Sequence, residues 1–179
     1  MTDDPNRPDR SHAILLDAFG RIAEGVPAVI DGLSAPQLLW QPDPAANSIG
    51  WLVWHLTRQQ DEQIAHLAGT PSVYRDGWEY GFGLPYPSGA HGFGMSAAEV
   101  AAFRLTEPAL LTGYYAATHE ATTRYLADLE PADHDRVIDR HWTPPVTVAV
   151  RIVSIFDDAA KHLGQAEYVR GLVLRRRPD

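Results

Sequence analysis

The 179-residue chain has no cysteine, which excludes disulfides, thiolate metal sites and a cysteine nucleophile together. Any metal site must therefore be built from histidine, aspartate or glutamate. The chain is also poor in positive charge, with 15 Lys and Arg against 23 Asp and Glu and a net charge of −8. We expect no nucleic-acid partner, because proteins that bind phosphate backbones need clustered positive charge.

Long apolar runs and internal repeats are also missing. No run approaches the roughly 18 apolar residues of a membrane span, and the first ten residues lack the apolar core of a signal peptide. We therefore expect a cytoplasmic protein without a membrane partner. The length suits one domain over residues 1–179, with flexible ends at 1–10 and 175–179.

Four segments repeat apolar residues at helical spacing, and none alternates convincingly as a half-buried strand does. The second begins at Asn47 or Ser48 and is stopped by Gly69. The third opens on a capping box of Ser96 and Glu99 and is broken near Pro108. The pattern predicts an all-α protein, a four-helix bundle of up-down character with helices at about 11–30, 48–67, 96–129 and 146–174.

The pattern also predicts details of the first helix and of the long connection. Ser11 is expected to cap the first helix, and Ile14 to lie on its apolar stripe. The segment 72–95, between the second and third helices, is rich in glycine and aromatic residues. Loops of this length are uncommon within a domain and are often functional, so we expect an ordered cover over one end of the bundle.

Two places put side chains that bind metals on the apolar helix faces. Asp158 and His162 are four residues apart on the last helix, so they lie on one face about one turn apart. Ile155 and Ala159 share this face, which indicates that it looks toward the core. His55 follows a nearly continuous apolar run and is expected to be buried. Together, His55, Asp158 and His162 would form a three-ligand site with a position left open for water or substrate.

Each of these residues also has an ordinary structural interpretation. Asp and His at this spacing commonly form a surface ion pair, and buried histidines often serve only the core. Lys161 could pair with Asp157 or Asp158, and Asp157 is expected to face solvent. We assign no ligand role to the other histidines, although one of them could reach a bound substrate from the Gly-rich loop and another is expected to be exposed on the third helix; they are His12, His66, His91, His119, His134 and His141.

The two blocks that carry these residues resemble the DinB-like superfamily, and within it the mycothiol-dependent metal transferases and the metal-binding domain of mycothiol-dependent maleylpyruvate isomerase. Residues 47–56 are similar to the S-x-x-W-x-x-x-H-L pattern of the family's second helix. Residues 158–165 are similar to its last helix, in which a His or Glu and a His four residues later are ligands. Asp158 departs from that pattern and is one methylene shorter than Glu.

The resemblance implies a divalent metal, zinc or nickel, held by His55, Asp158 and His162, with Gln165 as a partner that supports His162. It also implies activation of a low-molecular-weight thiol, mycothiol, for attack on a small electrophile. Because the chain has no cysteine, that thiol must be a co-substrate. Two alternatives stay open: a metal-dependent hydrolase at the same site, and a non-catalytic bundle with a vestigial site. A homodimer is compatible with the sequence.

Overall fold

The computed structural model describes residues 10–176 and confirms the all-α, four-helix bundle. The long helices are α1 (Ser11–Ile30), α3 (Ile49–Ala68), α6 (Ala109–Ala127) and α7 (Val148–Arg175). Shorter elements occupy the connections, namely α2 (Ala35–Leu39), η1 (Val73–Arg75), α4 (Trp78–Phe82), α5 (Ala97–Ala101), η2 (Pro131–Asp133), β1 (Val137–Asp139) and β2 (Val146–Thr147). The flexible ends predicted at 1–10 and 175–179 lie largely outside the described residues, and the single domain stays a prediction.

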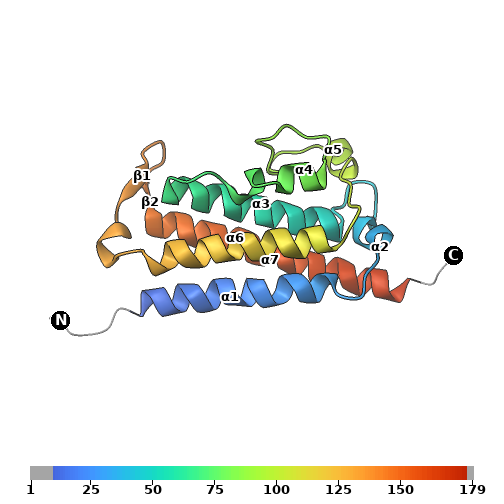
Figure 1. Ribbon diagram of the computed structural model, residues 1–179, viewed down its shortest axis with the longest axis horizontal. Coiled ribbons are helices and arrows are strands. Elements are labelled where there is room, and N and C mark those ends of the chain that lie inside the picture. The colour runs from blue at the N-terminus through green and yellow to red at the C-terminus, as the bar shows by residue number, and fades with distance from the viewer. Residues whose placement is uncertain (1–9, 177–179) are drawn as a thin grey trace.

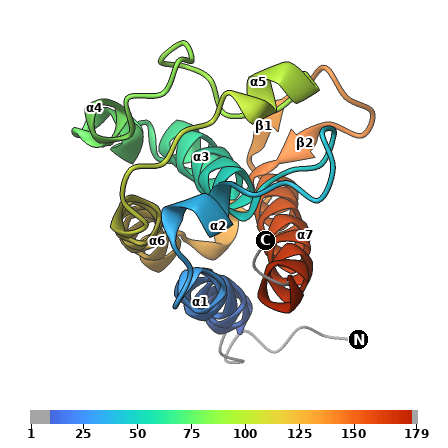
Figure 2. The same cartoon turned by 90° about the vertical axis from the view of Figure 1, so that its right-hand side faces the viewer.

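The four long helices do not alternate strictly in direction. Figure 2 looks along the bundle and shows α1 and α3 at opposite corners, each packed between α6 and α7. Phe19 contacts Phe156, and Val29 accepts a hydrogen bond from Arg170, so α1 and α7 run in parallel. The contacts between α3 and α6 also follow a parallel order, and α3 runs against α7 (Figure 1).

This parallel pair explains the long segment between α3 and α6. A 20-residue helix is about 30 Å long, so the chain must return along the full length of α3 before α6 can start in the same direction. Residues 69–108, here called the crossover segment, make this return along the outer side of α3 and α6 and include η1, α4 and α5 (Figures 1 and 2). The predicted cover is therefore ordered, but it lies along the side of the bundle.

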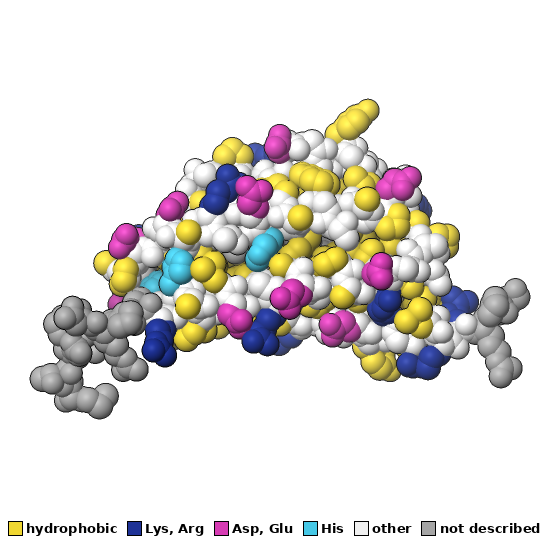
Figure 3. All heavy atoms as spheres, turned by 60° about the horizontal axis from the view of Figure 1, so that its bottom comes forward, with side chains coloured by type: hydrophobic (Ala, Val, Ile, Leu, Met, Phe, Trp, Pro, Cys, Tyr) yellow, Lys and Arg dark blue, Asp and Glu magenta, His cyan; other side chains and the backbone are white. Residues whose placement is uncertain are grey.

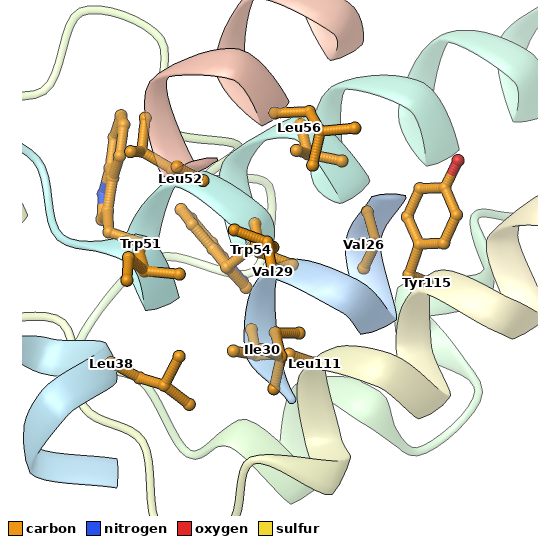
Figure 4. Close-up of a cluster of buried hydrophobic side chains, with 14 of the residues drawn as sticks. Val26, Val29, Ile30, Leu38, Trp51, Leu52, Trp54, Leu56, Leu111 and Tyr115 are labelled. Carbon is orange, nitrogen blue, oxygen red and sulfur yellow. The ribbon is translucent and has the colours of Figure 1, made fainter. Parts of the chain in front are cut away.

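The cover buries the first half of α3 on all sides. Every residue from Ile49 to Arg58 is buried, although periodicity had placed only one stripe of this helix in the core. Its side chains meet those of α1, α2 and α6 in the main apolar cluster (Figure 4). Polar side chains on a helix that is buried on every side need hydrogen-bond or ion-pair partners. Several such side chains lie at the centre of α3.

One polar group of α3 fastens the crossover segment. The carboxylate of Asp61 is 2% exposed and accepts hydrogen bonds at 2.8 Å from the backbone N–H groups of Val73 and Tyr74. It also accepts one at 2.6 Å from the hydroxyl of Tyr114 on α6. The fully buried guanidinium of Arg58 lies 3.5 Å from Asp61 and donates to the carbonyl oxygen of Ala90 at 3.1 Å. Two points of the crossover segment are thereby joined to one buried ion pair.

Several local predictions are confirmed, and others are wrong. Ser48 caps α3, and Ser96 forms the predicted capping box with Glu99. Ser11, however, is the first residue of α1, and the N-cap is Arg10. Ile14 is 66% exposed, because the buried residues of α1 lie further along the helix. Two further differences lie outside α1. The short β1–β2 pairing was not predicted, and His119 is half-buried against Tyr115.

Among the helices within residues 10–176, none is both long and apolar enough to cross a membrane. The face in Figure 3 carries acidic and basic side chains scattered among apolar ones.

Candidate metal site

The three residues singled out from the sequence lie together between α3 and α7. His55, Asp158 and His162 each offer one ligand atom, and these atoms all lie within 4.8 Å of one another. His55 is 4% exposed, and the other two are partly buried. Among residues 10–176, these three side chains form the one group of three or more His, Asp or Glu residues that lie close enough together to hold a metal ion. The three side chains fit a divalent cation.

The ring of His55 is held from two sides. Its Nδ1 donates to the carbonyl oxygen of His91 in the crossover segment, so the neutral ring carries its lone pair on Nε2. Trp51, one turn earlier on α3, stacks on the ring at 4.7 Å between centroids and 17° between planes. Burial lowers the pKa of His55, which keeps the ring neutral and able to bind a cation at neutral pH.

His162 is oriented in the same way from its own helix. Its Nδ1 lies 3.1 Å from Oε1 of Gln165, which accepts the hydrogen bond and leaves Nε2 directed at the cluster. Nε2 is 3.5 Å from Oδ1 of Asp158. This contact with the carboxylate raises the pKa of His162, because the carboxylate favours a positive charge beside it. The ring contacts that of His55 edge-on, with 4.6 Å between their centroids.

Asp158 has an oxygen that the protein leaves unused. Its Oδ2 is buried and has no hydrogen-bond partner among the described residues. Lys161 does not compete for Asp158, since it pairs with the exposed Asp157 at 2.6 Å. A carboxylate oxygen without a partner beside two imidazole lone pairs creates a negative potential that a cation would relieve. Two nitrogens and one oxygen are a donor set that zinc accepts.

The cluster meets an open cavity of about 720 Å³, which Asp158 helps to line. The cavity is bounded by α3, the crossover segment, the β1–β2 loop and α7. This volume is in the range that holds a small ligand. A molecule in the cavity would therefore have access to the side of the cluster that carries Asp158.

Comparison with known proteins places this chain in a family. The sequence matches the DinB superfamily over residues 18–166, which is most of the chain and includes all three candidate ligands. This chain belongs to the DinB superfamily. A crystal structure of a conserved protein from Enterococcus faecalis is similar, with 32% sequence identity and a TM-score of 0.88, covering 93% of this chain and 98% of that one. No curated protein matches the sequence.

The DinB superfamily includes metal-binding members, and the family match agrees with a site between α3 and α7. Helical spacing alone could pair Asp158 with His162, because both lie on α7. It could not place His55 beside them, since that contact depends on how α3 and α7 are oriented. The hypothesis of a three-ligand site came from the residue types on two apolar helix faces, and the resemblance of both blocks to the DinB pattern supported it.

The crossover segment contributes two features of this DinB site that the sequence analysis did not assign. One is the backbone carbonyl of His91, which any residue type could supply. The other is Gly92, whose φ of +98° favours glycine and whose hydrogen faces the ring of His55. A Cβ at this position would lie 2.3 Å from Nδ1 of His55. The glycine was the one signal of this close approach in the sequence.

Gly92→Ala is expected to weaken zinc affinity by about 10- to 100-fold, as removal of an outer partner of a ligating histidine does. The added methyl group must push the segment away from His55 and break the hydrogen bond to His91. Isothermal titration of the metal-free protein with zinc measures the effect. Gly94→Ala is the matched control, since Gly94 also has a positive φ of 75° but no atom within 4 Å of an added Cβ. Equal affinities for the two variants would contradict the role given to Gly92.

Proposed function

We propose that the protein is a metal-dependent thiol S-transferase that activates a low-molecular-weight thiol for attack on a small electrophile. The observation that carries the proposal is the convergence of His55, Asp158 and His162 beside an open cavity. Three protein ligands with a fourth position accessible are typical of catalytic zinc sites, whereas structural zinc sites have four protein ligands. Zinc or nickel is the proposed metal, and mycothiol the proposed thiol.

The protein's own side chains would prepare the site in three ways. Hydrogen bonds to His91 and Gln165 fix the two imidazoles with Nε2 directed inward. Asp158 supplies the negative charge that balances a divalent cation. The buried rings of Trp51 and His55 exclude water from the inner side of the site. These residues need little rearrangement when a cation enters.

When bound, a divalent metal lowers the pKa of a thiol enough for it to ionise at neutral pH. The thiol proton passes to solvent, and the sulfur forms a bond to the electrophilic carbon while the leaving group departs with its electron pair. The chain has no cysteine to compete as a nucleophile, so the sulfur comes from the co-substrate. Aromatic residues of the crossover segment, among them Phe93 at the cavity, suit an apolar electrophile.

The test is a conjugation assay with zinc-loaded protein, mycothiol and 1-chloro-2,4-dinitrobenzene. We expect an S-conjugate and released chloride at a rate that needs protein, thiol and metal together, and that His55→Ala removes. His12→Ala is the matched control, because His12 lies on α1 and does not line the cavity. Hydrolysis that proceeds equally without thiol would favour a hydrolase. Failure to bind zinc or nickel at all would exclude both enzymes and leave a non-catalytic bundle.

A further inference from the structure

The cavity beside the metal cluster is lined by two facing rows of polar side chains. On α3 the row holds Gln59 and Gln63, one and two turns beyond His55. On α7 it holds Ser154 and Arg151, one and two turns before Asp158. Because α3 and α7 run in opposite directions, the two rows face each other and lead away from the cluster. Arg151 stands at the far end of this polar groove.

Arg151 is held in position by a neutral group. Its Nη1 donates to Oε1 of Gln63 at 2.9 Å, and Nε2 of Gln63 donates to the carbonyl oxygen of Gln59 at 3.2 Å. The second hydrogen bond fixes which way the amide faces, so the oxygen points at the guanidinium. One of the five N–H groups of Arg151 is used in this way, and the guanidinium is planar and always charged.

The acidic side chains of the cavity are occupied elsewhere. Glu62 accepts from Arg58 at 2.7 Å, and Asp139 accepts from the ring and backbone of His141 at 2.8 and 2.9 Å. Asp158 belongs to the metal cluster. Within residues 10–176, no carboxylate lies within ion-pair distance of the partly buried Arg151. Asp139 lies beyond that distance, although the charge of Arg151 contributes, after the hydrogen bonds from His141, to lowering its pKa. A partly buried guanidinium that no carboxylate contacts directly is suited to bind a carboxylate or phosphate of a ligand.

We propose that Arg151 binds an anionic group, a carboxylate or a phosphate, on one of the two reactants that meet at the metal cluster. Arg151 and Asp158 are seven residues apart on one helix, which separates their backbones by about 10 Å along the axis. The anion therefore lies about two helical turns from the reacting end of the molecule. The amides and the hydroxyl between them suit a linker with hydrogen-bonding groups. This inference rests on the proposed function for the identity of the reactants.

The test measures equilibrium binding to zinc-loaded and metal-free protein by isothermal titration, without turnover. The thiol arm uses 3-mercaptopropionate and 8-mercaptooctanoate with their carboxamides. The electrophile arm uses 4-chloro-3-nitrobenzoate with its carboxamide. In the arm whose reactant carries the anion, we expect the carboxylate to bind about tenfold or more tightly than the amide, because a charge-assisted bond replaces a neutral one. In the thiol arm, only the longer chain reaches Arg151 from the metal.

Arg151→Gln is expected to abolish the preference for carboxylate. Arg124→Gln is the matched control, since Arg124 is exposed on α6, and it should keep the preference. Equal binding of acid and amide in both arms, or a preference that survives in Arg151→Gln, would overturn the inference. The metal-free titrations of the benzoate pair test Arg151 without the cluster. A protein that binds no metal but keeps this preference would therefore contradict the proposed function alone.

Discussion

Asp61→Ala is expected to destabilise the folded protein by about 3–5 kcal/mol, because several buried donors lose their acceptor at about 1–3 kcal/mol each. The substitution removes one of two carboxylates beside the fully buried Arg58, which keeps its ion pair with Glu62. It also leaves the N–H groups of Val73 and Tyr74 and the hydroxyl of Tyr114 without their acceptor. Since whole proteins are stable by about 5–15 kcal/mol, one side chain would account for a large share.

The measurement is urea unfolding followed by circular dichroism in the presence of a chelator, so that metal binding does not contribute. Glu120→Ala, on the exposed face of α6, is the control and should change stability by no more than about half a kcal/mol. If Asp61→Ala does not fold, Tyr114→Phe tests the same network by removing the hydroxyl that donates to Asp61 and accepts from Arg58, with a smaller loss. A loss below about 1 kcal/mol in Asp61→Ala would show that the network does not hold the crossover segment.

Asp158→Ala is expected to weaken zinc affinity at least about tenfold, or 1.4 kcal/mol in binding free energy, and His55→Ala to weaken it further. Each substitution removes one of three converging ligand atoms, and His55 is the most buried of the three. Outer partners of ligands already contribute 10- to 100-fold to metal affinity, so a ligand itself should contribute no less.

Competition against a chromophoric chelator measures these affinities, and the zinc-induced rise in melting temperature checks them independently. Asp157→Ala is the matched control, because Asp157 is the neighbouring carboxylate, is exposed and pairs with Lys161. It should bind zinc as the unaltered protein does. An unchanged affinity in Asp158→Ala would remove Asp158 from the ligand set and leave the two histidines.

The helices were predictable wherever a local signal decides the structure. Ser48 and Ser96 cap the starts of their helices, and Gly69 caps the end of α3. These caps use hydrogen bonds and backbone angles that depend only on near neighbours. Helix direction is not local, so periodicity could not reveal that α3 and α6 run in parallel. Periodicity also indicated only one apolar face on α3. The segment that covers the other side of α3 is distant in sequence, so local spacing could not predict that burial.

The candidate site, too, was predictable from the sequence only in part. Asp158 and His162 share one helix, and their spacing is sufficient to bring them together. His55 was grouped with them as a metal-competent side chain on an apolar helix face, and the resemblance to a known family supported this grouping. The hydrogen-bond partner of His55 is a backbone carbonyl, which any residue type could supply and which the sequence therefore does not reveal. Arg58 and Asp61 resemble ordinary exposed polar residues in the sequence, and only the structure shows that they are buried.

The order of the three candidate ligands along the chain has a consequence for how the protein is made. His55 leaves the ribosome with α3, whereas Asp158 and His162 follow only with the last helix. Chains fold from the N-terminus onward during synthesis, and contacts between distant residues form late because long loops must close first. A cation that needs all three side chains can therefore enter only a finished chain. An unfinished protein would not sequester metal in the cell.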